Sequence, residues 1–144
     1  MSDTLIPTVM NTVEENNGLL NDFEYETQPD FTHKLHIESE RIAGYVDGIE
    51  AYKQAVYKIL STERYEHIIY SWNYGIELKD LFGQPIAYVV PELERRITEA
   101  VMTDERTDSV SNFEFDTSKR GVVHVKFKAT SIYGEVEVEK DVEI

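Results

Sequence analysis

The last eleven residues, Gly134 to Ile144, alternate between charged and apolar side chains. Every odd position from Glu135 to Glu143 is acidic, and four of the five even positions from Val136 onward are Val or Ile. Because successive side chains of a β-strand point to opposite faces, this pattern predicts a strand with one apolar face and one carboxylate face. A shift by one residue would bring five carboxylates into the core, so the register is well specified.

This strand comes last in the sequence, which bears on its free edge. No later segment follows that could pair with the edge that the sheet leaves open. We therefore expect this edge to be guarded or to be used by another chain. The candidate partner-binding residues on it are Glu135, Val136, Glu137, Val138 and Glu139.

Length and composition favour one globular domain. A chain of 144 residues, 41% hydrophobic and 11% aromatic, is large enough to bury a single core. Its formal net charge of −14 argues against nucleic acid and anionic membranes as partners, because both are bound through cationic side chains. There is no cysteine for a disulfide or a thiolate metal site. Without a secretion signal or a long apolar run, we expect assembly in the cytoplasm.

The first 32 residues differ from the rest of the chain. They are acidic and contain no Lys or Arg, which first appears at Lys34, and their apolar residues form only scattered clusters. We predict an extended acidic arm over residues 1–32 that lies along a neighbouring surface, with a frayed terminus as the alternative. Residues 33–144 then form the single domain.

The domain is predicted to be α+β, with two main helices packed on a small, mostly antiparallel sheet. A short strand and a loop are expected over residues 34–46. Asp47 and Glu50 have the spacing of a capping box at the start of an amphipathic helix over 48–61. The second helix is predicted at 91–102, since proline at its first residue suits a first helical turn.

Between and after these helices the sequence favours extended structure. Residues 65–74 are rich in aromatic and β-branched side chains and predict a strand or irregular extended segment packed on the first helix, and one helical turn is expected over 77–82. The chain then ends in a three-stranded meander over 110–116, 122–131 and 135–143, in which Lys126 and Lys128 face the carboxylates of the last strand.

Catalytic and metal-binding motifs are weak. The four histidines are dispersed, and no phosphate-binding glycine loop or nucleophile elbow occurs, so no cofactor or metal is predicted. Glu77 with Asp80, or Asp104 with Glu105, could form an acid/base pair of the glycosidase type. A general acid, however, requires an apolar pocket that raises its pKa, and these carboxylates lie among polar residues, which favours solvated surface groups.

The segment Thr103 to Thr107 links the second helix to the meander. Arg106 lies there among acidic residues and could be buried in a subunit contact as a planar, bidentate donor. A solvated loop is the alternative, and spacing alone favours it.

The order of these elements resembles the baseplate wedge family of contractile tails, which includes the sheath initiators of myophages, phage-like bacteriocins and type VI secretion systems. The resemblance covers residues 35–144 and is nearest to a defective-prophage branch in Gram-positive bacteria. It is carried by Lys58–Tyr65, Tyr70–Glu77, Leu93–Ala100 and the terminal meander.

The wider family carries a Glu-Pro-Arg motif after its last helix. Asp104, Glu105 and Arg106 occupy these places here, and only the arginine matches. The resemblance implies that these three residues, with Trp72 and Tyr74, contact partners.

The resemblance also implies a structural, non-enzymatic protein of a virion or bacteriocin particle, present as six copies around the tail tube. Its implied partners are baseplate wedge proteins, tube or hub proteins, and the tail sheath protein. Sheath subunits of such tails exchange terminal strands, so the resemblance implies that the last strand starts this exchange. A baseplate peptidoglycan hydrolase and an acidic adaptor unrelated to tails are the alternatives.

Overall fold

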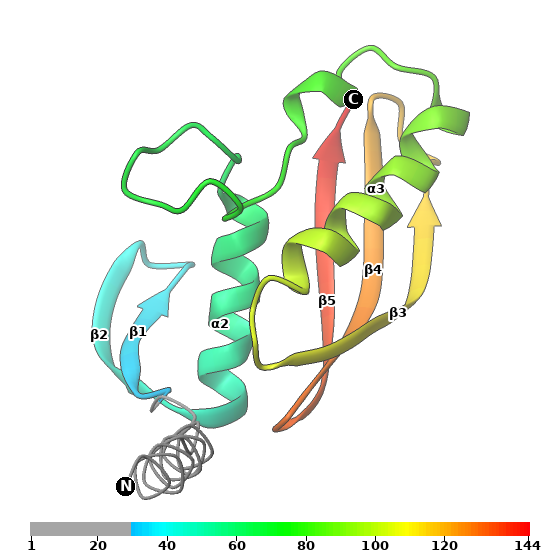
Figure 1. Ribbon diagram of the computed structural model, residues 1–144. Coiled ribbons are helices and arrows are strands. Elements are labelled where there is room, and N and C mark those ends of the chain that lie inside the picture. The colour runs from blue at the N-terminus through cyan, green and yellow to red at the C-terminus, as the bar shows by residue number, and fades with distance from the viewer. Residues whose placement is uncertain (1–29) are drawn as a thin grey trace, which may run out of the picture.

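The computed structural model describes residues 30–144. In chain order the elements are β1 (Thr32–His36), β2 (Arg41–Val46), α2 (Gly48–Ser61), the short 3-10 helix η2 (Lys79–Leu81), α3 (Ile86–Val101), β3 (Thr107–Asp116), β4 (Val122–Ser131) and β5 (Gly134–Glu143). Figure 1 shows α3 crossing in front of the β3–β4–β5 sheet and α2 standing beside β5, with the β1–β2 hairpin on the other side of α2. The predicted α+β class is confirmed. The predicted N-terminal arm lies, apart from its last three residues, outside the described residues.

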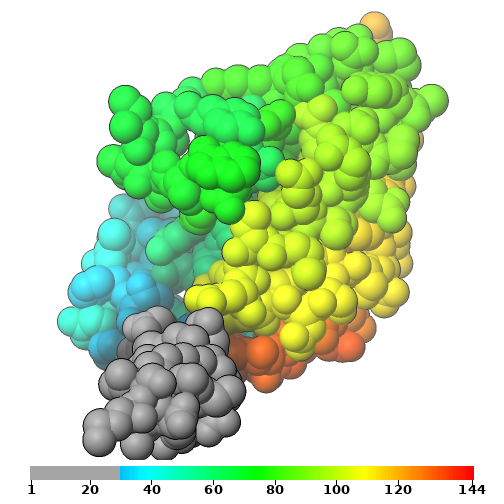
Figure 2. Space-filling model, in the orientation of Figure 1, coloured from blue at the N-terminus to red at the C-terminus, as the bar shows by residue number. Residues whose placement is uncertain are grey.

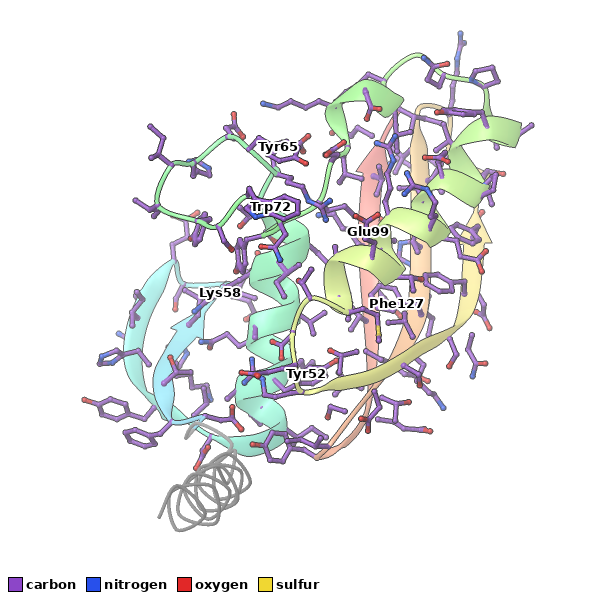
Figure 3. The ribbon with its side chains drawn as sticks, viewed as in Figure 1. Tyr52, Lys58, Tyr65, Trp72, Glu99 and Phe127 are labelled. Atoms are coloured by element: carbon purple, nitrogen blue, oxygen red, sulfur yellow. The ribbon has the colours of Figure 1, made fainter. Side chains whose placement is uncertain are left out.

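The C-terminal sheet is the predicted antiparallel meander, although β3 begins three residues earlier than expected. In β5 the apolar residues face inward, with Val136 and Val142 buried, while the acidic residues between them are exposed. Alternate residues of β4 pack into the same core, and Phe127 lies at its centre between the helices and the sheet (Figure 3). The register that the alternation predicts is therefore the one that forms.

The outer face of this sheet carries the predicted cross-strand ion pairs. Lys128 Nζ lies 2.9 Å from a Glu135 carboxylate oxygen, and Lys126 Nζ lies 3.5 Å from Glu137 and 3.6 Å from Glu139. The predicted pairing of both lysines with the last strand is confirmed.

The two edges of the sheet differ in regularity. β5 pairs with β4 without interruption from Gly134 to Glu143. β3 carries an extra residue relative to β4 at two places, and Asn112, at the second of these, has a φ of 55°. Such bulges bend and twist an edge strand and disturb its hydrogen-bonding groups. The β5 edge is thus straight, and the β3 edge is irregular.

Helix α2 spans the predicted residues, but its first turn is not the predicted capping box. The Asp47 side chain accepts a hydrogen bond from the Gly48 amide, and not from the third residue of the helix. Gly48 has a φ of +58°, so the helix begins with a turn that a capping box does not allow. Ahead of α2, the predicted strand and loop are in fact a hairpin of two strands, in which Gly44 occupies a bulge.

Helix α3 begins at Ile86, five residues before the predicted start at Pro91. The prediction is wrong because Pro91 is tolerated at the sixth helical position, where its ring removes one main-chain hydrogen bond. The added turn brings Val89 into the core on the same face as Leu93, and both are fully buried. Burial of this face outweighs the local preference of proline.

Residues 65–74 form a loop of turns rather than a strand. The predicted packing on α2 holds for Tyr74, which packs against the core and lines a cavity with Lys58 and Ile59. The exposed large hydrophobic side chains of the loop are Tyr65, Ile68, Ile69, Tyr70 and Trp72, of which Trp72 is 77% exposed. Figure 2 shows this green segment as a lobe at the upper left of the molecule, and Figure 3 places Tyr65 and Trp72 on it, away from Phe127. The base of the loop is fixed, because Glu63 bridges to Ile76 and Gly75 packs directly against the Thr62 carbonyl.

Candidate partner-binding site

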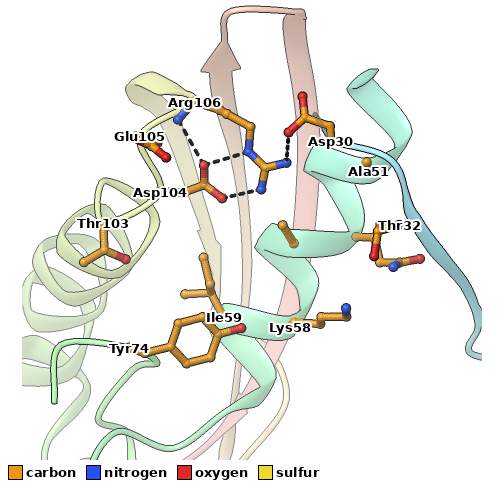
Figure 4. Close-up of a pocket in the computed structure, with 12 residues that line it drawn as sticks. Asp30, Thr32, Ala51, Lys58, Ile59, Tyr74, Thr103, Asp104, Glu105 and Arg106 are labelled. Carbon is orange, nitrogen blue, oxygen red and sulfur yellow. Dashed lines mark hydrogen bonds and ion pairs between the residues drawn. The ribbon is translucent and has the colours of Figure 1, made fainter. Parts of the chain in front are cut away.

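Arg106 is held by two carboxylates at the junction of α3 and β3. Its Nε and Nη2 groups donate to the Asp104 carboxylate at 2.9 and 2.6 Å, and Nη1 donates to Asp30 at 2.8 Å (Figure 4). The guanidinium carbon also lies 5.7 Å from the centre of the Tyr52 ring. The structure thus joins the residues before β1 to the loop that precedes β3.

These side chains are largely removed from solvent. The exposed fractions are 17% for Arg106, 10% for Asp104 and 7% for Asp30. Burial alone would raise the pKa of Asp104, but the side-chain and main-chain hydrogen bonds from Arg106 more than offset this and hold it below its usual range. The expectation of a solvated loop with solvated carboxylates is therefore wrong for Asp104 and Arg106, whereas Glu105 is exposed.

The ion cluster lines a cavity of about 610 Å³ with Tyr74 and residues of α2. The Oδ2 atom of Asp30 is buried and has no hydrogen-bond partner among residues 30–144. Tyr74 stacks on Tyr70 with ring centres 4.5 Å apart, whereas Trp72 points into solvent. The predicted contact residues therefore lie in three places: at this cluster, on the exposed loop, and on β5.

The hydrogen-bond pattern between β4 and β5 shows which main-chain groups of β5 point outward from the sheet. The amide of Ile144 donates to the carbonyl of Gly121, so Ile144 bonds toward β4. In an antiparallel ladder only every second residue bonds toward a given neighbour. The even residues of β5 therefore bond to β4, and the amides and carbonyls of the odd residues point outward. Within residues 30–144, those of Glu137 and Glu139 have no hydrogen-bond partner.

This edge opens into a groove of about 250 Å³ between β5 and the β1–β2 hairpin, with α2 along one side. Glu137, Val138 and Glu139 line it from β5, and the opposite wall includes Leu35, Val46 and Tyr57. The edge that the sequence predicts to be unpaired therefore lies along this groove.

The hairpin wall of the groove is fixed to α2 by Gln54. Its Nε2 group donates to the His33 carbonyl, and its Oε1 accepts from the Leu35 amide, both at 2.8 Å. The side chain thereby occupies main-chain groups on the edge of β1 that faces α2. Gln54 and Asp30 are not predictable from the sequence, because both act through partners at least 19 residues away that no local motif indicates.

Two of the four carboxylates proposed for acid/base chemistry, Asp80 and Asp104, have environments that oppose that role. Asp80 is bound by Arg96, whose hydrogen bonds hold the pKa of Asp80 below its usual range. Asp104 is shifted in the same direction. A general acid needs a raised pKa, so neither group is suited to donate a proton near neutral pH.

Two further observations concern residues 30–144. No helix there is long and apolar enough to cross a membrane. In the same part of the chain, no group of three or more His, Asp or Glu side chains is placed to hold a metal ion.

Comparison with known proteins identifies the family. The model of the contractile injection system sheath initiator family matches residues 24–134. The chain is also 39% identical, over 114 residues, to the phage-like element PBSX protein XkdS of Bacillus subtilis (strain 168), covering 76% of this chain and 79% of that protein. The matched family span ends where β5 begins. The resemblance noted from the sequence is confirmed, and the chain belongs to the contractile injection system sheath initiator family.

Proposed function

We propose that this protein is a non-enzymatic baseplate subunit that starts sheath assembly by accepting a strand of the first sheath layer at β5. The observation that carries the proposal is the straight outer edge of β5, whose odd main-chain groups are unpaired within residues 30–144 and face a groove. A strand added there satisfies these groups at about 0.5–1.5 kcal/mol per hydrogen bond. Six copies around the tube would bind the first sheath layer together, so the contributions of the six added strands would combine as avidity.

The remaining predicted contact residues serve attachment to the baseplate in this proposal. Trp72 and Tyr74 belong to a loop with a fixed base and exposed aromatic side chains, which are frequent anchors of protein interfaces. Glu105 extends from the Asp104–Arg106 turn into solvent. We assign these to contacts with wedge, tube or hub proteins in a virion or bacteriocin particle, with Arg106 holding the turn in place.

The proposal is tested by removing an outward main-chain donor without disturbing the internal ladder. In Glu139→Pro the lost amide is one that points away from β4, a position where an edge strand tolerates proline. The variant should remain folded by circular dichroism, but particles assembled with it should have tubes without ordered sheath in electron micrographs. Glu139→Gln, which keeps the amide and removes only the charge, is the matched control and should give sheathed particles. Normally sheathed particles from a folded Glu139→Pro variant would refute the proposal.

A further inference from the structure

Within residues 30–144, the ion pairs of the β5 carboxylates all run to side chains of β4. Glu135, Glu137, Glu139 and Asp141 are each more than half exposed. The facing side chains of β4 are Lys126, Lys128 and His124, so the five acidic residues of β5 meet two lysines and one histidine. On the groove side, Lys34 and Lys53 line the same groove as Glu50, Glu137 and Glu139. Three carboxylates therefore meet two lysines there, and a negative surplus of one charge remains.

The β4–β5 pairing shows which side chains suit these carboxylates. Lys126 lies directly opposite Glu139 and Lys128 opposite Glu137 in the register. A strand on the other side of β5 would stand in the same relation to the same acidic residues. Opposite charges in such cross-strand pairs are stabilising and like charges directly opposite are destabilising.

The other face of an added strand would meet different surroundings. The groove has an apolar part beside the outer edge of β5, formed by Leu35, Ile37, Val46, Tyr57 and Val138, and it is also lined by Lys34, Glu50, Lys53 and Gln54. Because side chains of a strand alternate between faces, an occupant must present apolar residues toward this apolar part at every second position.

We propose that the occupant of this groove is a strand of a partner chain in which Lys or Arg alternates with apolar residues. The inference rests on the proposed function, because it specifies the strand that β5 accepts. β4 is an internal example of the pattern, since His124, Lys126 and Lys128 alternate with buried apolar residues.

The same charges exclude two other occupants. Residues 1–33 of this chain contain no Lys or Arg, so they cannot supply the cationic face. A second copy pairing through its own β5 would place carboxylates beside carboxylates, which disfavours edge-to-edge dimers. The edge therefore rejects copies of this chain and selects a basic strand.

The test uses synthetic strands and the full-length protein. A peptide of about nine residues that alternates Lys and Val should bind and shift the amide resonances of β5, with an affinity that falls as salt rises. A Glu–Val peptide should not bind, and a scrambled Lys/Val peptide of equal charge should bind about tenfold more weakly. Equal binding of the scrambled peptide, or shifts confined to other elements, would overturn the inference.

Charge reversal provides the second arm. Glu137→Lys combined with Glu139→Lys should exchange the preference, so that the Glu–Val peptide binds and the Lys–Val peptide does not. Glu114→Lys changes an exposed acidic residue of the same sheet on β3 and should leave the preference unaltered. An unaltered preference in the double variant would contradict the inference.

The two proposals fail separately. If Glu139→Pro removes the sheath while charge reversal leaves both peptide preference and sheath unchanged, strand addition stands and the rule for basic strands is wrong. If Glu139→Pro leaves the sheath intact, the proposed function fails whichever peptide binds.

Discussion

Replacing Arg106 by Met should destabilise the protein strongly, because it leaves two carboxylates without their common cation. Asp30 and Asp104 are only 7% and 10% exposed, so water from the adjoining cavity replaces the guanidinium only in part. Breaking a buried ion pair by removing one partner costs about 3–5 kcal/mol. We expect a loss of about 3 kcal/mol in the free energy of unfolding near pH 7.5, measured by urea denaturation.

The effect of pH on this loss has a defined sign. In the native protein the pKa of Asp104 is lowered, so its contribution to stability is present above the unfolded pKa of about 3.9 and is lost as pH falls through the folded value. In Arg106→Met, burial of Asp104 is opposed only by the main-chain hydrogen bond from residue 106, which is the smaller effect, so the folded pKa rises above the unfolded one. The penalty is then relieved by protonation, so the difference between the two proteins should narrow from about pH 7.5 to about pH 5.

Arg95→Met is the matched control for this experiment. Arg95 also pairs with two carboxylates, Glu92 and Glu99, but it is 58% exposed and lies on the solvent face of α3. Pairs of this kind contribute little to stability. If Arg106→Met were no more harmful than Arg95→Met, or if its loss stayed constant with pH, the account of a buried, charge-balanced cluster would be refuted.

Three further outcomes can be checked on the purified protein. Gly75→Ala should lower the free energy of unfolding by more than about 1 kcal/mol in a urea titration, because φ is +95° and a Cβ would lie 2.5 Å from the Thr62 carbonyl oxygen. Gly83→Ala is the control and should cost less, because a Cβ at Gly83 would meet open space. The pKa of His124 should exceed about 6.5 in an NMR titration, because Asp141 accepts a hydrogen bond from its ring. This contact stabilises the folded protein below the unfolded pKa of His124, and the contribution is lost as pH rises through the folded pKa. Asp141→Asn should lower the pKa of His124 toward its ordinary value. Trp72, the single tryptophan, should be quenched freely by iodide in the isolated protein and be protected in assembled particles.

Local sequence patterns predict the parts of this fold whose signal is also local. The meander follows from alternation within each strand, and Lys126 finds its predicted acidic neighbours because the hairpin turn fixes the register. The start of α3 escapes prediction because burial of Val89 outweighs the preference of Pro91. In residues 65–74 the aromatic content predicts a packed strand, but Tyr65, Tyr70 and Trp72 are exposed and Tyr74 alone of the aromatic residues there packs against the core.

The candidate site was only half predictable. The unpaired edge of β5 follows from the terminal alternation, but the groove beside it depends on how the β1–β2 hairpin is tied to α2. Arg106 stood out among acidic neighbours, yet its partner Asp30 lies 76 residues away and was assigned to an extended arm. Such a contact arises from the packing of the whole domain and leaves no periodic trace in the sequence.

The contrast between the two edge strands gives the sheet a polarity. An added strand would meet an uninterrupted row of main-chain donors and acceptors along β5, whereas two bulges interrupt the corresponding row along β3. Under the proposed function, a strand adds on the β5 side of the sheet and not on the β3 side. This asymmetry is built into each subunit, so the direction of sheath growth would be set before any second component of the assembly has bound.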